Sequence, residues 1–392
     1  MSIAFTPAKI GPMVLKNRFM RSATCEALSD EKGFPKPQLF QMMEKLSQNE
    51  VGLIIPGYVY PSEKYKAMKG QTGFYSQAHA DVWKNTIANI HKNGSKIMFQ
   101  IAHGGQAVLK GGERCGPSKL LNIPGMTIPQ IEELIDSFHK SALYAKSVGA
   151  DGVELHAAHG YLLSTFLSPA LNRRSDKYGG SIEGRVRIVS EIAETLRKST
   201  GPDFAIGIKM NGYDNIPFGV TPKISSQYVN LLKGKIDLFE ISGGISIGTL
   251  RCKGRMNFLQ RLMFICGGFI PQTIFAALSK DQEKMMNVME NFQSLFDKKY
   301  YDGYCLEAAE YIKRNNPDVC VASVAGHRKI ENINEILDQE KVDLISLSRP
   351  LIREPNLIKR FKQNKATESQ CKSCNHCLYS IAFGNPLRCS YP

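Results

Sequence analysis

Gly152-Val-Glu-Leu-His156 is a short, mostly apolar run that predicts a β-strand buried on both faces. A helical pattern over residues 128–147 precedes it, and another over residues 182–198 follows it. A strand between two helices is the repeating unit of a protein with a parallel sheet.

The same unit recurs along the whole chain of 392 residues. Eight strand–helix units without a return to antiparallel pairing predict a closed TIM (β/α)8 barrel over residues 1–362. No Gly-x-Gly-x-x-Gly sequence follows the first strand, which disfavours an open doubly wound sheet. The predicted strands cover residues 17–22, 51–59, 95–102, 152–156, 205–210, 236–242, 320–324 and 342–348. The predicted helices cover residues 38–49, 78–92, 128–147, 182–198, 221–233, 306–314, 333–340 and 356–362.

The composition, with 43 % apolar and 22 % charged residues, is that of a globular protein. The net charge of +14 leaves open a basic soluble protein and a protein with a polyanionic partner. Basic residues form no run of five or more, so we expect no nucleic-acid partner. Residues 1–9 carry no signal peptide, so we expect a cytoplasmic protein with reduced thiols.

Residues 256–299 interrupt the repeat between the sixth strand and the sixth helix. Their apolar part, 262–278, approaches the length of a membrane span, but glycines and a proline interrupt it. Several interpretations stay open: a folded insertion at the barrel mouth or in a homo-oligomer contact, a membrane-surface or poorly ordered segment, and a membrane span. Because loops after strands lie on the active face, an insertion here would form a lid.

Polar or glycine-rich residues stand at the end of every predicted strand, where the catalytic groups of such a barrel gather. They predict one mouth that binds a large ligand. The ends of the seventh and eighth strands predict a phosphate site, because Gly326 permits close backbone approach and Arg349 supplies a permanent cation.

His156 and His159 follow the fourth strand, three residues apart. Zinc ligands, buried structural histidines and donors that face a ligand are the three interpretations. The spacing is not the i, i+4 pair of a metalloprotease helix, and no nearby carboxylate supplies a third ligand. We therefore expect the two histidines to face the ligand.

Two stretches carry a resemblance to a known family: Leu15-Lys-Asn-Arg-Phe-Met-Arg-Ser-Ala-Thr-Cys25 and His156-Ala-Ala-His-Gly-Tyr-Leu-Leu-Ser-Thr-Phe-Leu-Ser-Pro-Ala-Leu-Asn-Arg-Arg-Ser-Asp-Lys-Tyr-Gly-Gly-Ser181. The chain resembles the Old Yellow Enzyme family of NAD(P)H:flavin oxidoreductases, over about residues 5–255 and 302–362. It departs from the family pattern at Gly184, at Ala325, where a common glycine pair is broken, and in the insertion. The resemblance implies a TIM barrel with FMN at the strand carboxyl ends and NAD(P)H as the reductant.

The resemblance also implies roles for single residues. Lys209 matches the cation beside flavin N1 and the C2 carbonyl, where it would stabilise an anionic hydroquinone. Gln100 would hydrogen-bond the pyrimidine edge. Cys25 matches a cysteine near flavin N5, with a small buried apolar residue as the alternative. The implied flavin-lining residues are Ala23, Thr24, Cys25, Gly57 and Gln100, and the implied phosphate-binding residues are Gly326, Ser348 and Arg349.

The implied reaction has two halves. NAD(P)H first reduces the flavin, and flavin N5 then gives hydride to the β-carbon of an alkene conjugated to a carbonyl or nitro group. His156 and His159 would hold the oxygen of this small-molecule substrate, and Tyr161 would protonate its α-carbon as a general acid.

Four cysteines crowd the tail of residues 363–392 and predict a metal site: Cys371, Cys374, Cys377 and Cys389. The tail resembles that of the 2,4-dienoyl-CoA reductase branch of the family, whose cysteines ligate a 4Fe–4S cluster that passes electrons to FMN. It departs from that branch by one residue between the second and third cysteines. A cluster, zinc and no metal stay open.

Two other functions stay open. A tRNA dihydrouridine synthase is also an FMN barrel and would suit the basic charge, but it would need a helical RNA-binding tail that the short C-terminus does not offer. A membrane-associated flavoprotein would dock through residues 262–278.

Overall fold

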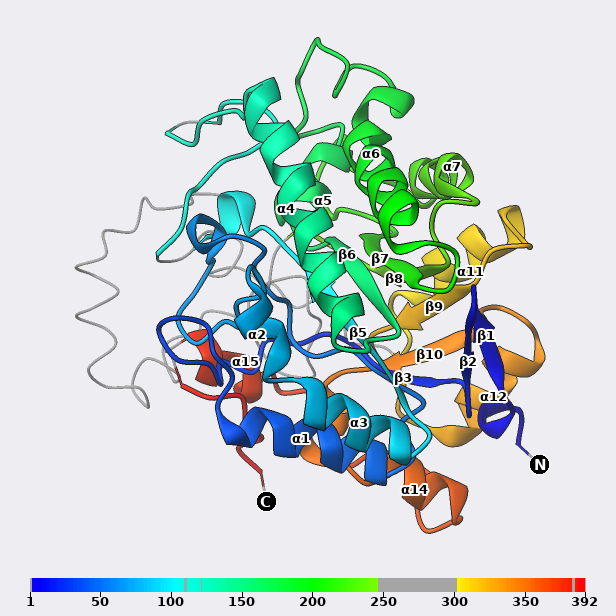
Figure 1. Cartoon of the computed structure of the whole chain (residues 1–392). Coiled ribbons are helices and arrows are strands. Elements are labelled where there is room, and N and C mark those ends of the chain that lie inside the picture. Colours follow the sequence, from blue (N-terminus) through cyan, green and yellow to red (C-terminus); the bar gives the residue numbers. More distant parts are fainter. Residues whose placement is uncertain (1, 109–110, 121, 246–301, 383–384, 392) are drawn as a thin grey trace, which may run out of the picture.

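A closed parallel barrel organises the molecule, as the sequence predicted (Figure 1). The computed structural model describes residues 2–108, 111–120, 122–245, 302–382 and 385–391. Within them, the strands follow one another around the barrel in the order β10-β3-β4-β5-β6-β7-β8-β9. Their bounds are β3 (Phe19–Arg21), β4 (Leu53–Ile54), β5 (Lys96–Ile101), β6 (Gly152–Ala157), β7 (Ala205–Asn211), β8 (Leu238–Ser242), β9 (Val321–Val324) and β10 (Leu344–Leu347).

Helices cover the outside of the barrel, each packing an apolar stripe on the strands. The predicted helix over residues 78–92 is interrupted at Val82 and Trp83, where the buried Trp83 ring packs edge-on against Phe40 and Phe99. The covering helices are α1 (Pro37–Gln48), α2 (Gln77–Asp81), α3 (Lys84–Lys92), α4 (Ile128–Ser147), α6 (Ile182–Thr200), α7 (Pro222–Leu232), α11 (Leu306–Asn315), α12 (Ile330–Asp338) and α14 (Leu357–Lys362). Three short helices were not predicted: α5 (Leu162–Leu167), α13 (Arg349–Arg353) and α15 (His376–Ala382).

An antiparallel hairpin of β1 (Ala8–Ile10) and β2 (Met13–Leu15) closes one end of the barrel. Its buried side chains form one apolar cluster with residues at the beginnings of barrel strands, among them Ala205, Leu238 and Leu344. Because strand beginnings and strand carboxyl ends lie at opposite ends of a parallel barrel, this hairpin leaves only the carboxyl end for a ligand.

The C-terminal tail packs at that carboxyl end. Cys377, Ile381 and Leu387 form a buried cluster with Ala27, in the loop after β3. The Leu387 N–H donates to the carbonyl of Glu26 at 2.8 Å. The division into a barrel of residues 1–362 and a tail of residues 363–392 stays a prediction.

Two sequence predictions depend on residues outside the described part. The insertion of residues 256–299 lies there, and so does its apolar segment 262–278. Among the helices that the structure describes, none combines the length and the apolar character that crossing a membrane requires.

Candidate active site at the mouth of the barrel

Four aromatic side chains form one group at the carboxyl ends of β4 and β6, in which Tyr58 and His156 are buried and His159 and Tyr161 are half-buried. The His156 ring centroid lies 4.6 Å from that of Tyr161 and 5.3 Å from that of His159. Tyr58, which follows β4, stacks 6.0 Å from His156, and the Tyr161 hydroxyl donates to the Tyr58 hydroxyl at 3.1 Å. The structure therefore brings three of the four predicted catalytic residues together and adds Tyr58, which the sequence did not single out. The fourth, Cys25, packs with Tyr161 against the cluster that contains Tyr58.

Both histidines of this group are neutral at physiological pH. Burial lowers the pKa of His156 well below its usual value, and nearby His159 and Lys209 lower it further. Burial, with Lys209, also lowers the pKa of His159 to about 3. The Nδ1 atom of His156 is buried and has no hydrogen-bond partner among the described residues. A buried polar atom without a partner costs free energy, and a polar ligand atom at this position would remove that cost.

His159 is held in an uncommon backbone conformation. Its φ is +62°, in the left-handed region that favours glycine. Its N–H donates to Asn211 Oδ1 at 3.1 Å, and its Nε2 lies 2.6 Å from Ser242 Oγ. Two strand ends, those of β7 and β8, thus fix the direction of this imidazole.

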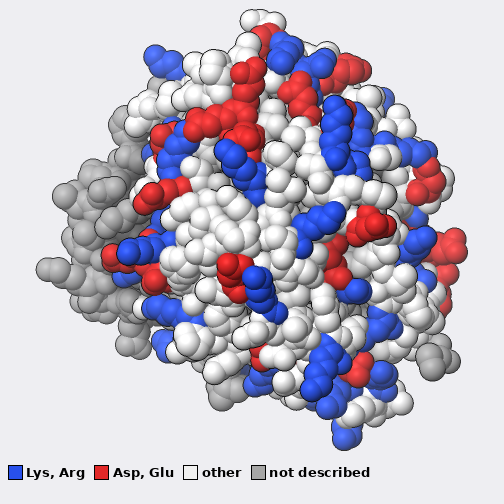
Figure 2. Space-filling view, viewed as in Figure 1, with Lys and Arg blue, Asp and Glu red and all other residues white. Residues whose placement is uncertain are grey.

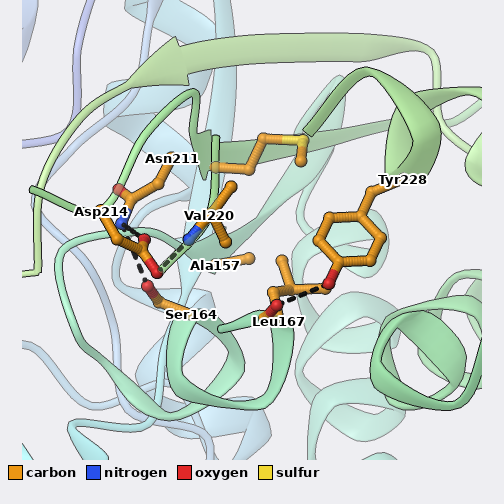
Figure 3. Close-up of a pocket in the computed structure, with 8 residues that line it drawn as sticks. Ala157, Ser164, Leu167, Asn211, Asp214, Val220 and Tyr228 are labelled. Atoms are coloured by element: carbon orange, nitrogen blue, oxygen red, sulfur yellow. Dashed lines mark hydrogen bonds between the residues drawn. The ribbon is translucent and has the colours of Figure 1, made fainter. Parts of the chain in front are cut away.

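A hydrogen-bond network around Asp214 holds the Asn211 side chain in place (Figure 3). The Asp214 carboxylate accepts from Asn211 Nδ2 at 3.0 Å, from the Val220 N–H at 2.8 Å and from Ser168 Oγ at 2.6 Å. The space that these residues line, between β6, β7 and α7, has no room for a water molecule. We therefore infer that the residues around this space hold Asn211, and through it His159, in place, and that the space itself binds no ligand.

Lys209, the predicted partner of the flavin N1 region, is an ion-paired residue. It is 1 % exposed, and its Nζ lies 3.1 Å from Glu240 Oε2 and 2.9 Å from Ser22 Oγ. The same Nζ lies 3.5 Å from the carbonyl of Ala23, in the segment predicted to line the flavin. Glu240 was not predicted as a functional residue, although a carboxylate in an otherwise apolar strand is a signal for one.

The flavin-lining segment after β3 is packed against a second buried ion pair. Arg21 Nη2 lies 2.6 Å from Glu26 Oε1, and both Glu26 oxygens accept from the Gly57 N–H at 3.0 Å. A Cβ atom at Gly57 would lie 2.3 Å from Glu26 Oε2, so this position requires glycine. Burial and Glu26 raise the pKa of Cys25 to about 12, so the thiol of Cys25 stays protonated.

The ends of β9 and β10 combine a buried arginine with backbone in the left-handed region, which suits a phosphate. Gly326 has a φ of +86°, and Ala325, where the family has a second glycine, adopts +84°. The Ser348 hydroxyl lies 2.7 Å from that of Thr24. The Arg349 side chain is buried, and its Nη1 donates to Asn375 Oδ1 of the tail at 2.5 Å.

Arg328 is a further cation at this end that the sequence interpretation missed. Its side chain is 8 % exposed, and its Nη2 donates to the carbonyl of Ser369 at 2.9 Å. Its Nε and Nη1 atoms are buried and have no hydrogen-bond partner among the described residues. Two unpartnered guanidinium donors two residues after Gly326 would suit a phosphate group, because arginine binds phosphate with a planar fork of donors.

The four tail cysteines carry no disulfide, and Cys371, Cys374 and Cys389 lie near enough to Cys377 to affect its thiol electrostatically. Burial raises the pKa of Cys377 to about 12, and the other three cysteines raise it further. Ser373 and Asn375 have φ values of +53° and +65°, which turn the chain between the cysteines. As the described side chains stand, no three His, Cys, Asp or Glu groups meet the geometry of a metal site.

Comparison with known proteins defines the class. The chain matches the NADH:flavin oxidoreductase / NADH oxidase family over residues 4–239. It is 25 % identical over 396 residues to 4,4'-dithiodibutanoate disulfide reductase of Rhodococcus erythropolis, covering 97 % of this chain and 93 % of the relative. It is 28 % identical over 412 residues to NADH oxidase of Thermoanaerobacter brockii, covering 98 % of this chain and 55 % of that relative.

A solved structure, a complex of 2-naphthoyl-CoA reductase, shares the fold with a TM-score of 0.82 at 22 % identity. The match covers 99 % of this chain and 56 % of that chain, so the protein spans about half the length of this structure and of the NADH oxidase. Fold and family together define a flavin-dependent oxidoreductase. The chain belongs to the NADH:flavin oxidoreductase / NADH oxidase family, and it is an enzyme that uses FMN and NAD(P)H.

Proposed function

We propose that the protein reduces alkenes conjugated to a carbonyl or nitro group, with NAD(P)H as the hydride source. The observation that carries the proposal is the group of His156, His159 and Tyr161, in which two neutral imidazoles stand beside a phenol. FMN, when bound, supplies the hydride carrier between nicotinamide and substrate. The protein then has to hold the substrate oxygen and deliver one proton.

The histidines suit the first task. A neutral imidazole donates one hydrogen bond, and such donors, buried away from water, polarise a carbonyl strongly. His156 Nδ1 has no partner among the described residues, and Ser242 and Asn211 keep His159 from turning away.

Tyr161 suits the second task. Burial raises the pKa of Tyr161 to about 12, so the phenol carries its proton throughout the physiological range. Its hydroxyl lies 3.1 Å from that of Tyr58, which can donate to the phenolate left after proton transfer. Tyr161 therefore acts as the general acid and Tyr58 positions it.

The residues that hold FMN in this proposal are those at the strand ends. Lys209 and Gln100 would bind the ring edge, and Ala23, Thr24, Cys25 and Gly57 would line the ring. Ser348, Arg349 and the Gly326 backbone would hold the phosphate, joined by Arg328, whose unpartnered donors support this assignment.

Anaerobic mixing tests the proposal. Purified holoprotein mixed with NADH or NADPH should lose the absorbance of oxidised flavin, and an enone, a nitroalkene or an enoyl-CoA should then restore it. The panel includes 4,4'-dithiodibutanoate, because one relative carries that name. If only 4,4'-dithiodibutanoate restored the absorbance of oxidised flavin, the result would contradict alkene reduction. A purified protein without FMN would contradict the whole proposal.

We further propose that the tail holds a 4Fe–4S cluster through Cys371, Cys374, Cys377 and Cys389, because four thiols without a disulfide lie together there. The holoprotein should contain iron and acid-labile sulfide in equal amounts, and Cys377→Ser should remove both. Cys320→Ser, at the base of β9, is the matched control and should retain them. Zinc without sulfide would contradict the cluster, and a metal-free protein would contradict the site.

The remaining proposals concern partners and location. On the face in Figure 2, basic and acidic side chains are interspersed, which supports a small-molecule substrate over a polyanion. We expect a cytoplasmic protein, with a homo-oligomer or membrane contact depending on residues 256–299.

A further inference from the structure

Two carboxyl groups and one ammonium group lie inside the barrel, between the apolar cluster of the hairpin and the mouth. Glu154 and Glu240 are 0 % exposed, and Lys209 is 1 % exposed. Glu154 projects from β6, Lys209 from β7 and Glu240 from β8, which are neighbouring strands of the barrel. Gly207 of β7, two residues before Lys209, pairs with Glu154 in register.

Each carboxyl group has one well-satisfied oxygen. Glu154 Oε2 accepts from Gln100 Nε2 at 2.6 Å. Glu240 Oε1 accepts from the hydroxyls of Ser22 at 2.7 Å and Ser346 at 2.6 Å. The other two oxygens, Glu154 Oε1 and Glu240 Oε2, are buried and have no hydrogen-bond partner among the described residues, although Glu240 Oε2 is ion-paired with Lys209 Nζ at 3.1 Å.

The two carboxyl groups lie near enough to each other that Glu240 raises the pKa of Glu154. Two buried carboxylates this near would repel each other, and a hydrogen bond between them needs a proton on one of the two. One proton between Glu154 Oε1 and Glu240 Oε2 satisfies both oxygens. It also avoids two adjacent buried negative charges, which would be costly.

The surrounding charges decide where the proton resides. Lys209 Nζ lies 3.1 Å from Glu240 Oε2, and it favours a negative charge on Glu240. Glu154 has no cation as near among the described residues, and burial raises its pKa well above its usual value. The other groups that face these three side chains are uncharged among the described residues. They are the hydroxyls of Ser22 and Ser346, the amide of Gln100 and the neutral imidazoles of His156 and His159.

We propose that Glu154 and Glu240 share one proton, held on Glu154, and that Glu240 stays ionised as the counter-charge of Lys209. This inference rests on the proposed function, which places the flavin beside Lys209. The flavin then faces an ion pair without net charge in place of a cation without a counter-charge. Glu240 is therefore a positioning residue that limits how strongly Lys209 stabilises the anionic hydroquinone. Glu154 keeps Glu240 ionised without adding a second charge.

Potentiometry of the holoenzyme tests the charge assignment. Glu240→Gln removes the counter-charge, so the ratio of reduced to oxidised flavin at a fixed potential should rise at least tenfold. Tenfold corresponds to about 30 mV for a two-electron couple. Glu154→Gln is the matched control, because the amide introduced by this substitution can donate to Glu240 and leaves the charge unchanged. The midpoint potential of the control variant should therefore stay near that of the wild type.

An infrared measurement on the apoprotein tests the shared proton without any cofactor. At neutral pH, the wild type should show the carbonyl stretch of a buried carboxylic acid, and Glu154→Gln should lose it. Absence of this band in the wild type would overturn the proposal, as would an equal rise in potential in both variants. If Glu240→Gln does not fold, the infrared comparison decides alone. A preparation that binds no FMN would refute the proposed function and leave the infrared result to judge this inference.

Discussion

Tyr161→Phe is expected to slow reduction of the alkene by roughly two to four orders of magnitude, the usual contribution of a positioned general acid. Reduction of the flavin by NAD(P)H should change little, because that half-reaction needs no proton from Tyr161. Both rates are measured by anaerobic stopped-flow, in separate mixing steps. Because burial raises the pKa of Tyr161 to about 12, this group stays protonated below that pH, and its own titration should not affect the wild-type rate between about pH 6 and 9.

Tyr58→Phe is the control for this result. It removes the hydroxyl that contacts Tyr161 at 3.1 Å but leaves the donor itself, so alkene reduction should fall by less than in Tyr161→Phe. Equal slowing of both half-reactions in Tyr161→Phe would show that the residue shapes the pocket and does not donate the proton.

Arg328→Met is expected to weaken FMN binding by about ten- to one-hundred-fold. The Nε and Nη1 donors of Arg328 are buried and unpartnered among the described residues, and a hydrogen bond to a charged group contributes about 1.5–3 kcal/mol. Methionine keeps most of the volume of the arginine stem and removes the charge. Titration of the apoprotein with FMN, followed by flavin fluorescence, gives the Kd.

Arg197→Met provides the matched control. Arg197 lies on α6 and pairs with Asp237, the residue before β8, at the end of the barrel opposite to the strand carboxyl ends. It is therefore an ion-paired arginine, as Arg328 is with Glu368 at 3.6 Å, but it lies away from the mouth. FMN affinity should not change in this variant. An unchanged Kd in Arg328→Met would mean that Arg349, Ser348 and the Gly326 backbone hold the phosphate without it.

The barrel could be predicted from the sequence because several strands are apolar on both faces and strands alternate with helices along the chain. The β1–β2 hairpin could not, since each of its strands has three residues and alternates only once. The split of the helix at Val82 and Trp83 was missed for a related reason. Its apolar periodicity continues through the break, and the buried Trp83 ring enforces the change of direction from tertiary packing.

The sequence could place a residue at the mouth where that residue stands near a strand end, as His156 and Lys209 do. The residues that act through another residue could not be predicted from the sequence. Glu240 and Glu154 lie inside strands, and only the closed barrel brings them together from β8 and β6. Tyr58 and Arg328 stand within one or two residues of Gly57 and Gly326, which were singled out, but only their burial and contacts distinguish them from ordinary loop residues.

The hairpin beneath the barrel also determines how the protein can be handled. Its inward residues are buried, but Val14 of β2 is 58 % exposed on the outer face, away from the mouth. A cysteine introduced there would give an anchoring point for a support, a dye or a sensor surface. Molecules fixed through it would all present their open end to the solution. An anchor on the tail would instead be attached beside Ala27 and Glu26, at the entrance itself.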